Sequence, residues 1–325
     1  WFDTGRPENG RSPGRSRDLP GLLPFSGRPV SNHRAGTGHL LRRAVGRAAL
    51  LRRCDVDSSG TDTLALEGGA TTFDSVLSRG NTSDVYALGV DAVIKVPRPE
   101  VPDHWVEIEA RYATAVHQAG LPSPMVLDVT TVDGRPAIVF ERVEGPSMLE
   151  ALSASPGDVD SFARDMAAIQ RELQAAPAPD PLPDLRGRVA GKIETAIGVS
   201  SHDRVEARKM LDGLPSGTSV CHGDLHPGNI LLGRRGPMVI DWFDATAGAP
   251  IADIVRTSLI IRPMRTVSAP PPHLPGVRCA VLERFHRIYV GCMLGDLDAG
   301  PVAALSWEAV LAVSRLAEPV GRELD

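Results

Sequence analysis

A polar stretch in the second half of the chain carries the residues best suited to chemistry. Residues 221–229 read CHGDLHPGN, which places Asp224 and Asn229 five positions apart. Pro227 and Gly228 lie between them and predict a loop, so both side chains can turn toward one point. An amide oxygen and a carboxylate suit Mg²⁺, and a further carboxylate can orient or deprotonate a hydroxyl. The spacing therefore indicates metal-assisted chemistry on a hydroxyl group.

A second carboxylate, Asp241, follows this loop. The apolar residues 230–232 and 238–240 predict two short strands joined by a turn. Such a hairpin returns Asp241 to the level of Asn229. We therefore expect Asp224, Asn229 and Asp241 to lie close together.

Cys221, His222 and His226 allow a different interpretation, as ligands of zinc. Gly223 and Pro227 break the helix that would align two histidines four residues apart. No carboxylate completes a geometry that would activate water. We therefore expect the two histidines to pack the loop, with His226 close to the residues that hold the metal.

The elements that must position these residues begin with strands. Strands are predicted at 73–80, 85–89, 92–96, 125–132 and 137–142, with glycine-containing turns between them. An apolar stripe at helical spacing predicts one helix over residues 105–119, which Gly120 ends. The first half therefore has the order strand, strand, strand, helix, strand, strand.

The second half is predicted to be mainly helical. Helices are expected at 158–175, 187–212, 251–262, 279–294 and 302–317, with a hairpin-like stretch at 218–241. A small β-rich lobe followed by a larger helical lobe belongs to the α+β class rather than to the doubly wound parallel sheets. We place the first lobe at residues 63–142 and the second at 143–325.

The amino-acid sequence of the polar stretch resembles that of a known family. The run HGDLHPGNIL, followed by VIDW and by GAPIAD at 248–253, closely resembles the aminoglycoside phosphotransferase family of kinase-like enzymes. The resemblance implies a bilobal protein-kinase-like fold. It also implies Asp224 as catalytic base, Asn229 and Asp241 as Mg²⁺ ligands, ATP or GTP as phosphate donor, and a small-molecule hydroxyl as acceptor.

The resemblance also implies residues that bind the nucleotide. Gly80 and Ser83 would belong to a loop that covers the phosphates. Lys95, at the end of the third strand, would bind the phosphates, and it is one of only three lysines in a chain with 32 arginines. A carboxylate on the next helix should hold Lys95, and the family pattern favours Glu109 over Glu107.

The connector between the lobes would hold the purine. There the backbone around Glu141 to Val143 is expected to form hydrogen bonds with the base.

The sequence differs in two ways from related enzymes, and both differences bear on the kind of acceptor that it uses. Trp242 stands where protein kinases carry phenylalanine and no Ala-Pro-Glu segment follows, so a small-molecule acceptor is favoured over a protein. Residues 151–325 hold 21 acidic and 18 basic side chains, a net charge of −3, which is no strong field for a polycationic antibiotic. We expect Asp244 and Asp253 to brace the loop or to cap the following helix.

The N-terminal region differs from the rest of the chain in its charge. Residues 1–53 carry 11 arginines against 3 acids, while the whole chain of 325 residues has a net charge of −5. We expect residues 1–62 to be a disordered basic extension, in which residues 39–53 could form a short amphipathic helix. We do not expect nucleic acid to be a partner, although an arginine-rich tail that binds it is one alternative.

The composition bears on the cellular location of the protein, and one alternative to an enzyme stays open. No apolar run is long enough to cross a membrane, and four widely spaced cysteines suggest no disulfide framework, so we expect a cytoplasmic protein. A nucleotide-binding interaction module without catalysis is the main alternative to an enzyme. The oligomeric state stays open.

Overall fold

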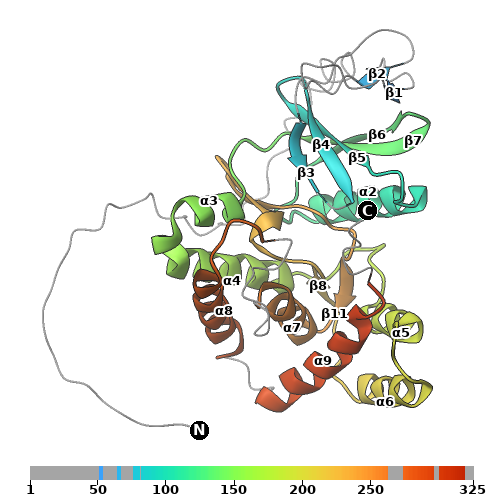
Figure 1. The fold of residues 1–325 in the computed structure, drawn as a ribbon, viewed down its shortest axis with the longest axis vertical. Coiled ribbons are helices and arrows are strands. Elements are labelled where there is room, and N and C mark those ends of the chain that lie inside the picture. Colours follow the sequence, from blue (N-terminus) through green and yellow to red (C-terminus); the bar gives the residue numbers. More distant parts are fainter. Residues whose placement is uncertain are drawn as a thin grey trace, which may run out of the picture.

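Two lobes lie one above the other, with a β-sheet dominating the first and helices the second (Figure 1). The structure is a computed structural model, and it describes residues 51–53, 64–66, 76–80, 82–262, 274–295 and 300–318. The α+β arrangement predicted from the sequence is confirmed. The predicted disordered region before residue 51 lies outside the described residues.

The first lobe is built on a seven-stranded sheet with the strand order β2-β1-β6-β7-β5-β4-β3. Its strands are β1 (Leu51–Arg53), β2 (Leu64–Leu66), β3 (Val76–Arg79), β4 (Ser83–Leu88), β5 (Ala92–Pro97), β6 (Val126–Val132) and β7 (Arg135–Glu141). Antiparallel pairing of β5 with β4 and with β7 places Lys95 opposite Val85 and Ile138, in the middle of the sheet. Lys95 therefore lies on a strand that is paired on both sides, which fixes its backbone.

The predicted order of strands is confirmed from β3 to β7, but two strands precede it. The helix predicted over residues 39–53 is wrong for its last three residues, which form strand β1. Leu51 of β1 pairs in parallel with Val132 of β6. An uncovered sheet edge carries unpaired backbone groups, and β1 satisfies some of those on β6. The rest of that predicted helix lies outside the described residues.

Helix α2 (Asp103–Gln118) lies under the sheet on the side of the second lobe (Figure 1). Its predicted apolar stripe is confirmed, and Val106 and Ala110 pack with Ile138 of β7 in a small buried cluster. Gly120, with a φ of 80°, follows the helix and turns the chain back toward β6. The packing fixes which face of α2 points toward Lys95.

The second lobe is mainly helical. Its helices are α3 (Met148–Ala154), α4 (Val159–Ala175), α5 (Leu185–Thr195), α6 (Ser201–Asp212), α7 (Pro250–Ile261), α8 (Cys279–Leu294) and α9 (Gly300–Arg315). Helices α4, α7 and α8 bury Met166, Ile254 and Phe285 in the main core. Among the described helices, none has the length and apolar character needed to cross a membrane.

Two helix predictions need correction. The helix expected at 187–212 is two helices, because Gly198 adopts a φ of 74° and Ser200 starts α6 by accepting a hydrogen bond from the backbone of Asp203. Helix α3 was not predicted. Its start carries a capping box in which Ser147 and Glu150 satisfy each other's backbone, a signal that the sequence does contain.

The stretch predicted as one hairpin, 218–241, divides into two small sheets. Strands β9 (Ile230–Gly233) and β10 (Gly236–Val239) form the expected hairpin. Strand β8 (Ser219–Cys221) instead pairs with β11 (Thr246–Gly248), which lies beyond Asp241. The polar stretch 222–229 therefore lies between two short ladders, which hold both of its ends.

The connector between the lobes lies against the β9–β10 hairpin. Gly145 has a φ of 150°, and a Cβ atom there would overlap the carbonyl oxygen of Leu232. We expect Gly145→Ala to lower the free energy of unfolding by about 3 kcal/mol or more, because strain and overlap act together. Gly191→Ala in α5 is the matched control: its Cβ would meet no atom within 4 Å, so stability should rise by about 0.5–1 kcal/mol. Urea unfolding of both variants tests this, and equal stabilities would contradict it.

Helices α7 and α8 are joined by a hydrogen bond between Ser258 Oγ and His286 Nε2, at 2.8 Å. Burial, helped by Arg262 and opposed by Glu308, lowers the pKa of His286 to about 4. The imidazole stays neutral in the fold but takes up a proton in the unfolded chain below its ordinary pKa of about 6.5. Stability is therefore lost as the pH falls from about 6.5 toward 4, by about 1 kcal/mol at pH 5 for this half-buried ring.

The measurement is urea unfolding at pH 7 and pH 5 for the wild type and His286→Gln. Glutamine can still bond Ser258 but does not titrate, so the variant should lose about 1 kcal/mol less than the wild type between the two pH values. The same loss in both proteins would show that His286 does not carry this effect.

Candidate active site

The loop between β8 and β9 brings Asp224 and Asn229 together as predicted. Gly223 turns the chain with a φ of 80°, and a short 3₁₀ turn, Pro227–Asn229, leads into β9. Asn229 Nδ2 donates to the backbone oxygen of Asp224 at 2.9 Å and lies 3.5 Å from its carboxylate Oδ2. The two side chains therefore share one side of the loop.

The hairpin then returns the chain to the same place. Val239 lies opposite Ile230, and the backbone N–H of Ile240 donates to the oxygen of Asn229 at 3.0 Å. Asp241 follows with a φ of 67°, in the left-handed region that non-glycine residues rarely adopt. Backbone strain of this kind is often found at functional sites.

Lys95 reaches this carboxylate from the first lobe. Its Nζ lies 2.5 Å from Glu109 Oε1 and 3.3 Å from Asp241 Oδ1. Burial alone would lower the pKa of Lys95, but Asp241 and Glu109 outweigh burial and hold the pKa above its ordinary value. Glu109 is buried on α2 whereas Glu107 is exposed, so the partner of Lys95 is the one that the sequence favoured.

Asp224 lies in a negative environment. Burial, and then the charges of Asp241 and Asp244, raise the pKa of Asp224 to about 8, while Arg256 opposes them. Arg256 is nearly buried and donates from Nε to the backbone oxygen of Gly223 at 2.9 Å. Sequence reasoning missed Arg256.

Asp253 and Asp244 brace the loop, as expected. Asp253 accepts from the backbone N–H of Gly223 at 2.8 Å and from Gln170 Nε2 at 2.8 Å. Asp244 pairs with Arg188 at 3.1 Å and with Lys192 at 3.3 Å. Sequence reasoning also missed Gln170 and Arg188.

The histidines pack the loop. His222 accepts from the backbone N–H of Asp224 at 3.2 Å, contacts the oxygen of Ile240 at 3.1 Å and packs on the ring of Trp242. His226 accepts from the N–H of Gly228 at 3.0 Å. Within the described residues no three His, Cys, Asp or Glu side chains gather to hold a metal, which leaves the zinc interpretation without support.

The loop before β4 closes through its own backbone. The N–H of Gly80 donates to the oxygen of Ser83 at 2.9 Å, and Arg98, just after β5, donates from Nε to the oxygen of Gly80 at 2.9 Å. Arg98 also pairs with Asp84 of β4 at 3.4 Å, so its side chain contacts both the loop and β4. Asn81 lies outside the described residues.

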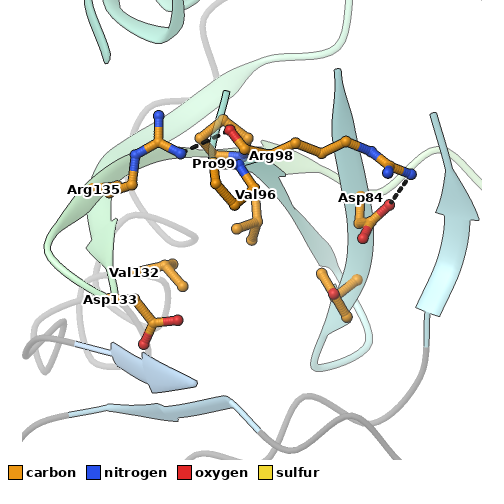
Figure 2. A pocket seen from close by; sticks show the side chains of 9 residues that line it. Asp84, Val96, Arg98, Pro99, Val132, Asp133 and Arg135 are labelled. Carbon is orange, nitrogen blue, oxygen red and sulfur yellow. Dashed lines mark hydrogen bonds and ion pairs between the residues drawn. The ribbon is translucent and has the colours of Figure 1, made fainter. Parts of the chain in front are cut away.

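Figure 2 shows a pocket in the first lobe that Arg98 helps to line. Arg135 donates to the backbone oxygen of Arg98 at 2.7 Å and pairs with Asp103 at 2.9 Å. The basic groups at this pocket are therefore engaged with the protein itself. The pocket does not include Lys95, Asp224 or Asp241.

Glu141 and Val143 lie where the first lobe ends. Glu141 is the last residue of β7, its N–H donates to the oxygen of Met125 at 2.9 Å, and its carboxylate pairs with Arg235 at 3.2 Å. Val143 follows in the connector, beside Gly233 of β9. The connector thus borders both the sheet and the β9–β10 hairpin.

A second hollow lies beside the catalytic loop and includes Gly223. Its charged lining residues are Arg188, Lys192, Arg256, Asp244, Asp253 and Glu318. Glu318, just after α9, lies 2.8 Å from both Lys192 and Arg256. Asp244 and Glu318 are therefore paired with the basic groups, whereas Asp253 is bonded to Gly223 and Gln170.

The donor set fits a divalent cation of the Mg²⁺ type. Asn229 directs Nδ2 to the backbone of Asp224, so its Oδ1 faces away from that bond. The side chain of Asp241 keeps 37% of its surface exposed. An amide oxygen and a carboxylate are hard ligands, and Mg²⁺ commonly takes few protein ligands together with phosphate oxygens.

Comparison with known proteins agrees with this geometry. A family model described as the phosphotransferase enzyme family matches residues 75–270. No curated protein matches the chain.

Several solved structures are similar to this chain. A thermostable mutant of aminoglycoside phosphotransferase APH(4)-Ia is 18% identical, with 75% of this chain and 85% of that chain covered and a TM-score of 0.52. A choline/ethanolamine kinase family protein from Mesorhizobium loti is 20% identical, with 75% and 76% covered and a TM-score of 0.48. Aminoglycoside phosphotransferase APH(3'')-Id from Streptomyces rimosus is 17% identical, with 71% and 89% covered and a TM-score of 0.48.

Proposed function

The chain belongs to the phosphotransferase enzyme family, and from that membership we propose that it transfers the γ-phosphate of ATP or GTP to a hydroxyl of a small molecule. Membership makes it a kinase-like small-molecule phosphotransferase. One observation carries the finer proposal: Lys95, Glu109 and Asp241 form one cluster, with Asp241 next to Asn229 and Asp224. These residues come from four separate parts of the chain.

Asp224 is proposed as the catalytic base. As the acceptor oxygen bonds to the γ-phosphorus, its proton moves to the Asp224 carboxylate, the bond between the γ-phosphorus and the bridging oxygen breaks, and the nucleoside diphosphate leaves. The transition state is stabilised mainly by positioning and charge neutralisation. Asp253 and Arg256 hold the backbone of Gly223 from both sides, which supports a fixed position for Asp224.

Asn229 and Asp241 are proposed to hold Mg²⁺. The ion would neutralise charge on the phosphates and offset the negative charge that raises the pKa of Asp224. Asp241 also accepts from Lys95, so the same carboxylate orients the lysine.

The remaining donor-side residues are proposed to bind the nucleotide. Lys95, held by Glu109, would contact the phosphates, and the loop of Gly80 and Ser83 would cover them. The backbone of Glu141 and Val143 would bond the purine.

The acceptor is proposed to bind beside Asp224, on the side of the second lobe. Residues 151–325, which make up most of that lobe, hold 21 acidic and 18 basic side chains, a net charge of −3. So small a net charge gives little attraction to a polycation. We therefore expect an acceptor that is a hydroxylated metabolite or a weakly charged antibiotic.

The test is phosphoryl transfer with Mg²⁺ and ATP or GTP over a panel of aminoglycosides, macrolides, amino alcohols and sugars, with Asp224→Ala as the blank. Phosphate incorporation into one panel member, absent in the blank, is the expected result. If the nucleotide binds and no panel member is phosphorylated above the blank, the catalytically silent nucleotide-binding module is the better description.

Two further proposals concern location and partners. We keep the cytoplasm as the proposed location, because the four cysteines have no framework spacing. We also keep the prediction that nucleic acid is not a partner, and retention of the full chain on DNA or RNA with a steep dependence on salt would contradict it.

A further inference from the structure

Helix α2 touches the segment around Asp241 at two points, one helical turn apart. Glu109 reaches Asp241 through Lys95. Trp105, four residues earlier and so on the same face of the helix, packs on Phe243 with ring centroids 4.8 Å apart and planes tilted by 31°. The second contact involves no residue of the proposed chemistry.

Phe243 is also contacted by the second lobe. The guanidinium carbon of Arg188 lies 5.2 Å from the centre of the Phe243 ring, a cation–π arrangement. Arg188 also donates from Nη2 to the backbone oxygen of Phe243 at 3.0 Å and pairs with Asp244. The ring of Phe243 therefore contacts both an aromatic side chain of the first lobe and a cation of the second.

The segment that carries Phe243 has little freedom. Trp242 is fully buried and donates from its indole N–H to the oxygen of Val239 at 2.9 Å. Asp241 just before it has the left-handed backbone described above. A shift of α2 relative to Phe243 would therefore shift Glu109 relative to Asp241 and to Lys95 on β5.

An ion pair alone does not fix this distance. Lysine and glutamate have several rotatable bonds and can stay paired while the helix moves, whereas two stacked rings have few rotamers and lose contact area at once. We propose that the Trp105–Phe243 contact positions α2 against the segment 241–243, so that Glu109 presents Lys95 to the phosphates of the nucleotide. This inference rests on the proposed function, because it assigns Lys95 to nucleotide binding.

The experiment measures the Kd of a non-hydrolysable ATP analogue with Mg²⁺ for the full chain and five variants. We expect Trp105→Leu and Phe243→Leu each to raise Kd about fivefold to tenfold, within the range of an aromatic pair. The double variant should be no weaker than the single variants, because both remove one contact. Trp105→Phe should stay within about twofold of the wild type, because it keeps a ring in place.

Two further readouts separate positioning from simple loss of structure. In the transfer assay, Trp105→Leu should raise the KM of the nucleotide and leave the KM of the acceptor unchanged, whereas partial unfolding lowers kcat alone by reducing the active fraction. Glu107→Gln, on the exposed face of α2, is the matched control and should keep the wild-type Kd.

The outcomes distinguish this inference from the proposed function. A wild-type Kd in Trp105→Leu, or effects that multiply to about 25-fold or more in the double variant, would overturn the positioning role while leaving the enzyme intact. If the wild-type chain binds neither ATP nor GTP, the proposed function itself fails.

Discussion

Asp224→Asn is expected to lower kcat by about a thousandfold while nucleotide affinity stays within about twofold. Asparagine has nearly the same shape, so the bond from Asn229 to the backbone oxygen of residue 224 persists, but its amide cannot accept the proton of the acceptor. The loss should therefore appear in the chemical step and not in binding.

Steady-state transfer assays, with nucleotide binding measured separately, check this prediction. Asp212→Asn, an exposed change of the same chemistry at the end of α6, is the control and should keep wild-type turnover. Equal turnover in Asp224→Asn and the wild type would mean that another group takes the proton.

The second large effect is expected from Asp241→Asn. Asparagine tolerates the left-handed backbone at this position, so the fold should be kept while one anionic ligand is lost. We expect the Mg²⁺ concentration for half-maximal turnover to rise at least about tenfold and kcat to fall about a hundredfold or more. Lys95 also loses one of its two carboxylate partners, which adds to the loss.

Turnover measured against Mg²⁺ concentration tests this, with thermal unfolding as a check on the fold. An unchanged Mg²⁺ dependence in a folded Asp241→Asn variant would remove Asp241 from the metal site.

Local patterns predicted the part of the site that one short stretch encodes. A turn between two apolar runs was enough to place Asp241 beside Asn229, because a hairpin fixes its own register. Lys95 and Glu109 were paired through the family resemblance, which could be applied because the strand and the helix that carry them have clear periodicity. Such features need few contacts between distant parts of the chain.

The other features of the fold and of the site depend on contacts between residues that lie far apart in the sequence. Arg256 on α7 meets the catalytic loop and Glu318, and Gln170 on α4 meets Asp253. The pairing of β8 with β11 was missed because strands of three residues carry too little alternation to identify their partners. Long-range packing decides these features. The break in the expected long helix is local instead, because Gly198 has a positive φ and Ser200 caps α6.

The ion pairs of Glu318 also order events during synthesis. Glu318 lies 94 positions after Asp224, so a growing chain exposes the catalytic loop well before it can close the pairs with Lys192 and Arg256. At about 5–20 residues per second on the ribosome, the loop waits on the order of 5–20 s. Until then the nascent protein lacks the carboxylate that holds Arg256, and Arg256 in turn anchors the backbone of Gly223. The anchor that Arg256 gives to the backbone of Gly223 is therefore completed only after residue 318 has been made.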